Sequence, residues 1–129
     1  MLIDTHCHLD KLDLSPYGNS LDNLIEAAAD AGVRQILSIS VDLENADEVI
    51  AFTDRSGIYA SVGVHPLHKE GLLEDDALLL KKSAHEKVIA VGETGLDFFY
   101  ESDLETLERQ KNSFAVHLSA AAKLGLPVV

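Results

Sequence analysis

One pattern recurs four times along the chain: a short, almost continuously apolar run is followed by a segment with helical periodicity. The expected strands are residues 1–8, 33–41, 58–64 and 87–91, and the expected helices lie between Ser20 and Gly32, between Asp42 and Gly57, from Asp75 to Lys82, and between Ser102 and Gly125. Strands that are apolar throughout, rather than alternating, are typical of a parallel sheet covered by crossover helices. The pattern therefore predicts an α/β fold with a parallel sheet.

The length of the repeating unit indicates which parallel α/β fold to expect. Each strand-helix unit takes roughly thirty residues, and a complete (β/α)8 barrel takes about 250. The chain of 129 residues then holds four units, and residues 126–129 have the character of an opening fifth strand. We expect one domain over residues 1–129, a half-barrel of TIM type, and a chain that is truncated relative to the whole barrel.

Charge and composition exclude several classes of protein. The formal net charge is -12 and there are only ten Lys and Arg residues, which is unlike a protein with a broad phosphate-binding surface. A single cysteine rules out an internal disulfide, and no leader sequence or membrane-length apolar run is present. We expect a cytoplasmic protein without membrane contact, in which a metal ion meets the charge of any anionic substrate locally.

The first strand carries a His-x-His pair, His6 and His8. Because side chains alternate along a strand, the two imidazoles are expected to share one face and Cys7 to point away from them. Two rigidly held imidazoles form a good partial site for a divalent ion. Taken alone, such a pair is more often an ordinary strand end or a chance pair than a metal site.

Three further polar residues follow strand ends: His65 after the third strand, Glu93 after the fourth and Asp97 just beyond it. Parallel strands present their carboxyl ends at one rim, so these groups are expected to converge with His6 and His8. Glu93 is the candidate catalytic residue, because a carboxylate can bridge two cations, although it could instead cap the next helix. His65 suits contact with substrate or metal-bound water, and Asp97 suits a supporting role that orients a ligand.

Asp4 and His117 are weaker candidates for supporting roles. Asp4 precedes the His-x-His pair by two residues, so it is expected on the same face, one layer deeper, where it could orient a ligand. His117 shares a helical face with Gln110 and Phe114 and could reach the sheet. Packing or support of a ligand is a better fit for His117 than ligation itself.

These motifs, in this order, resemble those of the TatD-family metal-dependent hydrolases, also called TatD DNases, of the amidohydrolase-like superfamily. The resemblance rests on IDTHCHLD at residues 3–10, GVHP at 63–66 and VGETGLD at 91–97, and it extends over the whole chain. It implies a TIM barrel with two divalent metal ions that hydrolyses phosphodiester bonds, with DNA as the usual substrate. Carried over by motif, His6 and His8 would bind one metal and Glu93 would bridge both.

The resemblance also implies an incomplete site. The family's other ligands, two histidines and an aspartate, lie beyond the stretch that matches residues 128–129. Residues 1–129 alone are therefore expected to hydrolyse little and to associate through open sheet edges. The metal stays open between Mg, Mn and Zn. Two other functions also stay open: a non-catalytic, metal-binding or self-associating half-barrel, and an amidohydrolase acting on a small amide or ester.

Overall fold

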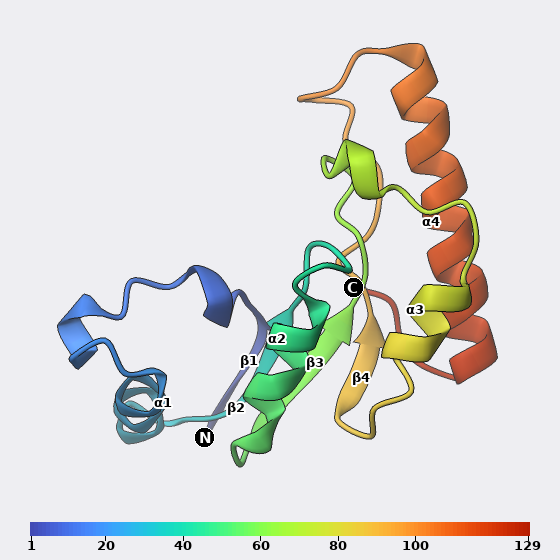
Figure 1. Ribbon diagram of the computed structural model, residues 1–129. Helices are drawn as coiled ribbons and strands as arrows, with labels where there is room; N and C mark the ends of the chain where they lie inside the picture. The colour runs from blue at the N-terminus through green and yellow to red at the C-terminus, as the bar shows by residue number, and fades with distance from the viewer.

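A four-stranded parallel sheet lies at the centre of the computed structural model, which describes residues 1–129 (Figure 1). Its order follows the sequence: β1 (Leu2–Cys7), β2 (Val33–Ile39), β3 (Ile58–Val62) and β4 (Val88–Val91). The helices are α1 (Leu21–Asp30), α2 (Ala46–Ala51), α3 (Ala77–Lys82) and α4 (Leu104–Leu124). Val128 adds an isolated parallel bridge to Val91 beside β4. The predicted four strand-helix units and the beginning of a fifth strand are thus confirmed.

Helix ends follow local capping chemistry, with one departure from expectation. Ser20 caps α1 by accepting the Asn23 N–H, as its sequence position indicates. The expected helix between Ser102 and Gly125 is capped by Asp103 and not by Ser102, because the Asp103 carboxylate accepts both the N–H and the hydroxyl of Thr106 at 2.8 Å. A carboxylate satisfies the free N–H groups and also interacts favourably with the positive end of the helix.

Helices cover one face of the sheet. A core of small and branched side chains joins α2, α3 and α4 to β3 and β4, and a smaller cluster joins α1 to β2 and β3. The other face is open: Ile3 on β1 and Ile89 on β4 are 52% and 39% exposed. The sheet is therefore a one-sided layer, and all four strands end at the same rim (Figure 1).

The buried face of α4 is more polar than the sequence suggests. Gln110, Ser113 and His117 are buried, whereas the apolar Leu118 on the same helix is exposed. The reason is that this part of α4 packs against loops with free backbone groups rather than against the apolar sheet, as described below. None of the helices combines the length with the apolar composition that a membrane span requires.

Candidate metal centre

The rim brings three of the predicted residues together. Nε2 of His6 and Nε2 of His8 lie 3.4 and 3.5 Å from Oε2 of Glu93. The two imidazole rings are 5.2 Å apart at their centroids, edge to face. One potential ligand atom from each residue lies within 4.8 Å of the other two. Residues more than eighty positions apart in the chain therefore face a common point.

These spacings fit ligands that surround an ion better than residues bonded to one another. Hydrogen bonds of this type measure roughly 2.7–3.2 Å. Ligands held about 2.0–2.2 Å from one cation are themselves about 3–3.5 Å apart. Two imidazole nitrogens and a carboxylate oxygen are also a donor set that Zn and Mn accept. The residues present therefore fit a divalent cation.

His8 is oriented for ligation by the strand beside it. Its Nδ1 lies 3.1 Å from the carbonyl oxygen of Ile39. A carbonyl only accepts, so Nδ1 carries the proton and donates it, and Nε2 keeps a free lone pair that points toward Glu93. Such a bond to the second ring nitrogen is the usual way in which proteins fix a metal-binding histidine.

Glu93 is positioned by the backbone of its neighbours. Its N–H donates to the carbonyl oxygen of Ser40 at 3.0 Å, and the N–H of Gly92 donates to Val62 at 2.8 Å. The turn also lies close to Gly63, where an added Cβ would be only 2.5 Å from the Gly92 backbone. The carboxylate therefore lies between the ends of β2 and β3, on the side of the histidines.

His65 lies on the opposite side of the same carboxylate. Its Nε2 is 3.6 Å from Oε1 of Glu93, and its Nδ1 accepts the N–H of Leu67 at 3.1 Å. Because Nδ1 is an acceptor, the neutral ring carries its proton on Nε2. His65 thus presents an N–H donor to the site, which suits an anionic oxygen of a substrate and not a metal ion.

A solvent-facing hollow joins these groups. It is lined by His8, Val41, His65, Leu67, His68 and Glu93. Beside it, a second group capable of binding a cation consists of Asp42, Glu44 and His68. The hollow gives a substrate access to Glu93 and His65 together.

Asp97 lies farther along the same loop and does not contact the histidine–carboxylate cluster. Its Oδ1 accepts the N–H groups of Phe99 and Tyr100 at 2.9 and 2.8 Å. Its own N–H donates to Oε1 of Gln110 at 2.8 Å. Instead of orienting a ligand, as expected, Asp97 shapes the loop that follows Glu93.

His117 is fully buried and both of its ring nitrogens have partners. Nε2 accepts the N–H of Val64 at 2.9 Å, and Nδ1 donates to the carbonyl oxygen of Ser113 at 2.7 Å. Burial lowers the pKa of His117, although the bond to Ser113 opposes the shift. The side chain therefore acts as a neutral tether that holds the backbone before His65.

Asp4 does not lie where the alternation of a strand predicts. Strand β1 has an irregularity between the pairs Asp4–Ile36 and Cys7–Ser38, with one more residue on β1 than on β2. The extra residue puts Asp4 on the face of Cys7, in a hollow against α1, and away from His6 and His8. Asp4 also raises the pKa of Cys7, after the larger effect of burial. Its contact with the site is limited to accepting the His6 N–H at 3.1 Å.

Two residues with clear positioning roles were not assigned any role from the sequence. Gln110 joins two rim loops, since it accepts from Asp97 and donates to the carbonyl oxygen of Pro66 at 3.2 Å. Ser113 accepts the N–H of Leu73 at 3.1 Å. The available signal was the helical spacing of Gln110, Ser113 and His117, which places three polar side chains on one side of α4.

A family model and several similar proteins point to the same family. The model of the family described as TatD related DNase matches residues 3–129. The uncharacterized metal-dependent hydrolase YcfH of Escherichia coli K12 is 34% identical over 129 residues, which covers 99% of this chain and 48% of YcfH. The uncharacterized metal-dependent hydrolase YabD of Bacillus subtilis is 35% identical over 133 residues, with coverage of 100% and 49%.

Solved structures agree with these sequence matches. The crystal structure of YjjV, a TatD homolog from E. coli K12, superposes with a TM-score of 0.79 at 33% identity, over 98% of this chain and 48% of that chain. A TatD-family hydrolase from Entamoeba histolytica superposes with a TM-score of 0.70 at 27% identity, with the same coverage. The predicted half-barrel fold class is confirmed. The chain spans about half the length of the relatives it matches.

Proposed function

Because the chain belongs to the TatD-related DNase family, we propose that its rim cluster is the metal-binding part of a hydrolase site that cleaves phosphodiester bonds in DNA. The observation that carries this proposal is the convergence of His6 Nε2 and His8 Nε2 on Oε2 of Glu93. The relatives named as metal-dependent hydrolases support the general chemistry. DNA as the substrate is the more specific part of the proposal.

Three residues would hold the metal. His6, His8 and the carboxylate of Glu93 would together hold one divalent ion. A carboxylate can be shared between two cations, so Glu93 would also serve a second ion, with Zn, Mn or Mg as the candidates. When bound, such cations lower the pKa of water and neutralise charge that develops on phosphoryl oxygens.

His65 would bind the substrate phosphate. With Nδ1 occupied by the Leu67 N–H, its Nε2–H is available to donate to a non-bridging phosphoryl oxygen. The tether from His117 to Val64 keeps this ring beside Glu93. His65 therefore orients the phosphodiester without taking part in metal binding.

Residues 1–129 provide few ligands for two ions. One ion would have two imidazoles and the Glu93 carboxylate, and the second would have only the shared carboxylate of Glu93. We therefore expect the chain alone to bind one cation and to hydrolyse DNA slowly. Joining it to the second half of a full-length relative should raise hydrolysis strongly.

The first test is metal binding. Titration calorimetry with Mn²⁺ and Zn²⁺ should give one site in the 129-residue chain, weakened at least about 10-fold in His8→Ala. His85→Ala is the matched control, because His85 is exposed and its Nδ1 accepts the N–H of Lys87, outside the site. Equal affinity of the His8→Ala and His85→Ala proteins would exclude the proposed centre.

The second test is hydrolysis of a labelled single-stranded oligonucleotide, with and without chelator, by the chain alone and by the joined form. Chelator-sensitive cleavage by the joined form only is the expected result. Rapid cleavage by the chain alone would contradict the incomplete site. Metal binding with no cleavage in the joined form would support a non-catalytic half-barrel, and cleavage of a small amide or ester but not of DNA would support the amidohydrolase alternative.

A further inference from the structure

The loop between β4 and α4 exposes three consecutive aromatic side chains, Phe98, Phe99 and Tyr100, here called the aromatic tip. They are 58%, 86% and 74% exposed. The tip contains two of the four Phe and one of the three Tyr residues of the chain. Exposed aromatic side chains gathered in this way mark a recognition surface more often than a packing accident.

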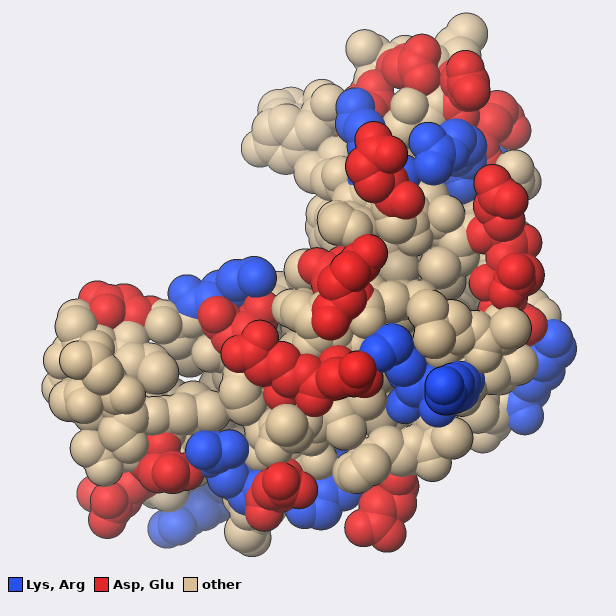
Figure 2. All heavy atoms as spheres, in the orientation of Figure 1, with Lys and Arg blue, Asp and Glu red and all other residues tan.

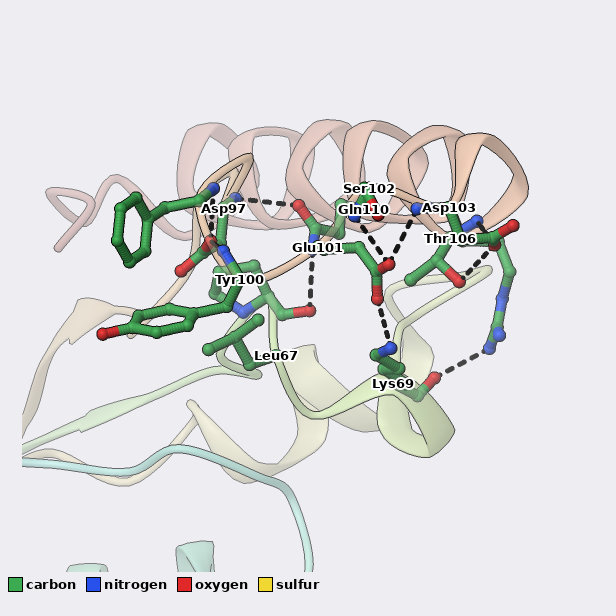
Figure 3. A network of polar contacts seen from close by, with 12 residues as sticks. Leu67, Lys69, Asp97, Tyr100, Glu101, Ser102, Asp103, Thr106 and Gln110 are labelled. Atoms are coloured by element: carbon green, nitrogen blue, oxygen red, sulfur yellow. Dashed lines mark hydrogen bonds and ion pairs between the residues drawn. The ribbon is translucent and has the colours of Figure 1, made fainter.

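The loop is anchored on both sides of the aromatic tip, as Figure 3 shows. Before it, Oδ1 of Asp97 accepts two backbone N–H groups of the tip, and Gln110 holds the Asp97 N–H. After it, the buried carboxylate of Glu101 accepts the N–H groups of Ser102 and Asp103 at 2.8 Å and pairs with Lys69. The backbone of the tip is therefore held at both ends by hydrogen bonds, which limits the ordering that a ligand would have to impose on the loop.

Ring geometry in the tip leaves aromatic faces open. Phe99 and Tyr100 contact edge to face, with centroids 4.6 Å apart and an angle of 86° between the ring planes. In this arrangement each ring supports the other without covering both of its faces. In Figure 3 the ring of Tyr100 extends away from the anchoring hydrogen bonds. The tip can therefore accept a flat, aromatic ligand by stacking.

Cations lie at the base of this loop in a chain whose net charge is -12. Lys69 pairs with Glu101, and Arg109 donates to the carbonyl oxygen of Lys69 at 2.8 Å. Figure 2 shows an uncharged protrusion at the top of the molecule with basic side chains beside it; acidic side chains surround these, and other basic side chains are scattered over the lower part of this face. Because both cations already have partners, the stacked base and not the phosphate would supply most of the binding energy.

The aromatic tip lies on the same side of the sheet as Glu93, beyond the carboxyl ends of the strands (Figure 1). The loop that carries it begins directly after Glu93, and Figure 1 shows it rising beyond the carboxyl ends of the strands. A strand of nucleic acid whose phosphate lies beside Glu93 and His65 would extend along this side.

We propose that the aromatic tip is a stacking surface for the bases of single-stranded nucleic acid next to the scissile phosphate. This proposal rests on the proposed function, since it names the form of substrate that the same site takes. Stacking supplies affinity that a chain with ten basic residues cannot obtain from the phosphate backbone. It also favours unpaired ends, because a base within a duplex has no free face.

The test is binding of fluorescein-labelled oligothymidylate of about ten nucleotides, compared with an abasic strand of the same length. Fluorescence anisotropy is measured in chelator and low salt, so that no metal contributes. Wild-type protein should bind the strand with bases more tightly than the abasic strand. Phe99→Ala and Tyr100→Ala should each weaken binding of the strand with bases roughly 5- to 100-fold, and that of the abasic strand hardly at all.

Two controls accompany these variants. Leu104→Ala removes another exposed apolar side chain, the first residue of α4, and should leave both affinities unchanged. Tyr100→Phe keeps the stacking face and should retain wild-type affinity. Circular dichroism verifies that all four variants are folded.

Several results would overturn the proposal: no binding by the wild type, equal affinity for the two strands, or full binding by Phe99→Ala. Capture of a protein partner through the tip, with no preference for bases, would do so as well. Base-dependent binding without metal-dependent hydrolysis would defeat only the proposed function. Hydrolysis at equal rates with and without bases beside the cleaved bond would defeat only this inference.

Discussion

The backbone N–H of Val64 donates to Nε2 of His117 at 2.9 Å, a bond that joins the end of β3 to the middle of α4. Both groups are buried, and the other ring nitrogen of His117 is occupied by Ser113. The residue after Val64 is His65, which lines the metal centre. The arrangement of the rim therefore depends on a helix that contributes no metal ligand.

Replacing His117 should destabilise the fold. In His117→Phe the buried Val64 N–H loses its hydrogen-bond partner, at a cost of about 1–3 kcal/mol. The Ser113 carbonyl loses the side-chain bond but keeps its place in the backbone hydrogen bonding of α4. Urea unfolding should show the loss as a lower midpoint. Leu118→Ala, at an exposed position of the same helix, should change stability by less than about 0.5 kcal/mol. Equal midpoints for wild type and His117→Phe would show that the tether is dispensable.

His117 should also make stability depend on pH. Burial lowers its pKa from the ordinary value of 6.5, so the folded chain binds fewer protons than the unfolded chain. The contribution of neutral His117 to the free energy of unfolding is therefore fully present above pH 6.5 and is lost as the pH falls toward the folded-state pKa. Metal-free wild type should lose more stability than His117→Phe between pH 7.5 and pH 5.5, which paired urea titrations at about these values would measure. Parallel pH profiles for the two proteins would contradict this.

Gln110 should control the two loops that it joins. Gln110→Ala removes the acceptor for Asp97 and the donor for Pro66, so we expect a loss of about 1–3 kcal/mol in unfolding free energy. Gln110→Glu keeps an acceptor and loses the donor, and should lie between wild type and Gln110→Ala. Unfolding in urea measures the order. Binding of the labelled oligothymidylate should weaken in the same order, because Gln110 anchors the loop of the aromatic tip.

Gly63→Ala should disturb the metal centre through the backbone. The added Cβ would lie 2.5 Å from backbone atoms of Gly92, and backbone cannot rotate away as a side chain can. The ends of β3 and β4 must then separate, which moves Glu93. We expect at least about 10-fold weaker binding of Mn²⁺ by calorimetry together with lower stability. Unchanged metal affinity would mean that the turn before Glu93 adjusts freely.

The open face of the sheet should promote self-association. Ile89 is exposed on the side that no helix covers, and such a surface favours pairing between chains. Sedimentation of wild type should show association that rises with concentration. Ile89→Lys should reduce it, whereas Leu78→Lys, an exposed site on α3, should not. A wild type that stays monomeric at high concentration would refute this expectation.

The sequence was sufficient to predict the parallel sheet and the convergence of His6, His8 and Glu93, because strand polarity alone brings carboxyl ends to one rim. It was insufficient for Asp4, since the irregularity in β1 that moves this residue to the other face depends on pairing with β2. For Gln110 and Ser113 the helical spacing with His117 indicated a shared polar side of α4, but not the groups that these side chains bind. Their partners are backbone groups of distant loops, and such groups leave no trace in residue type.

The polar face of α4 should couple the local unfolding of the loops that it binds. Gln110, Ser113 and His117 attach three rim segments to one helix. Amide hydrogens in those segments should therefore exchange with deuterium at a shared rate, set by detachment of α4, and not at separate rates typical of surface loops. A single cooperative unit would then include the substrate-facing rim and its distant scaffold.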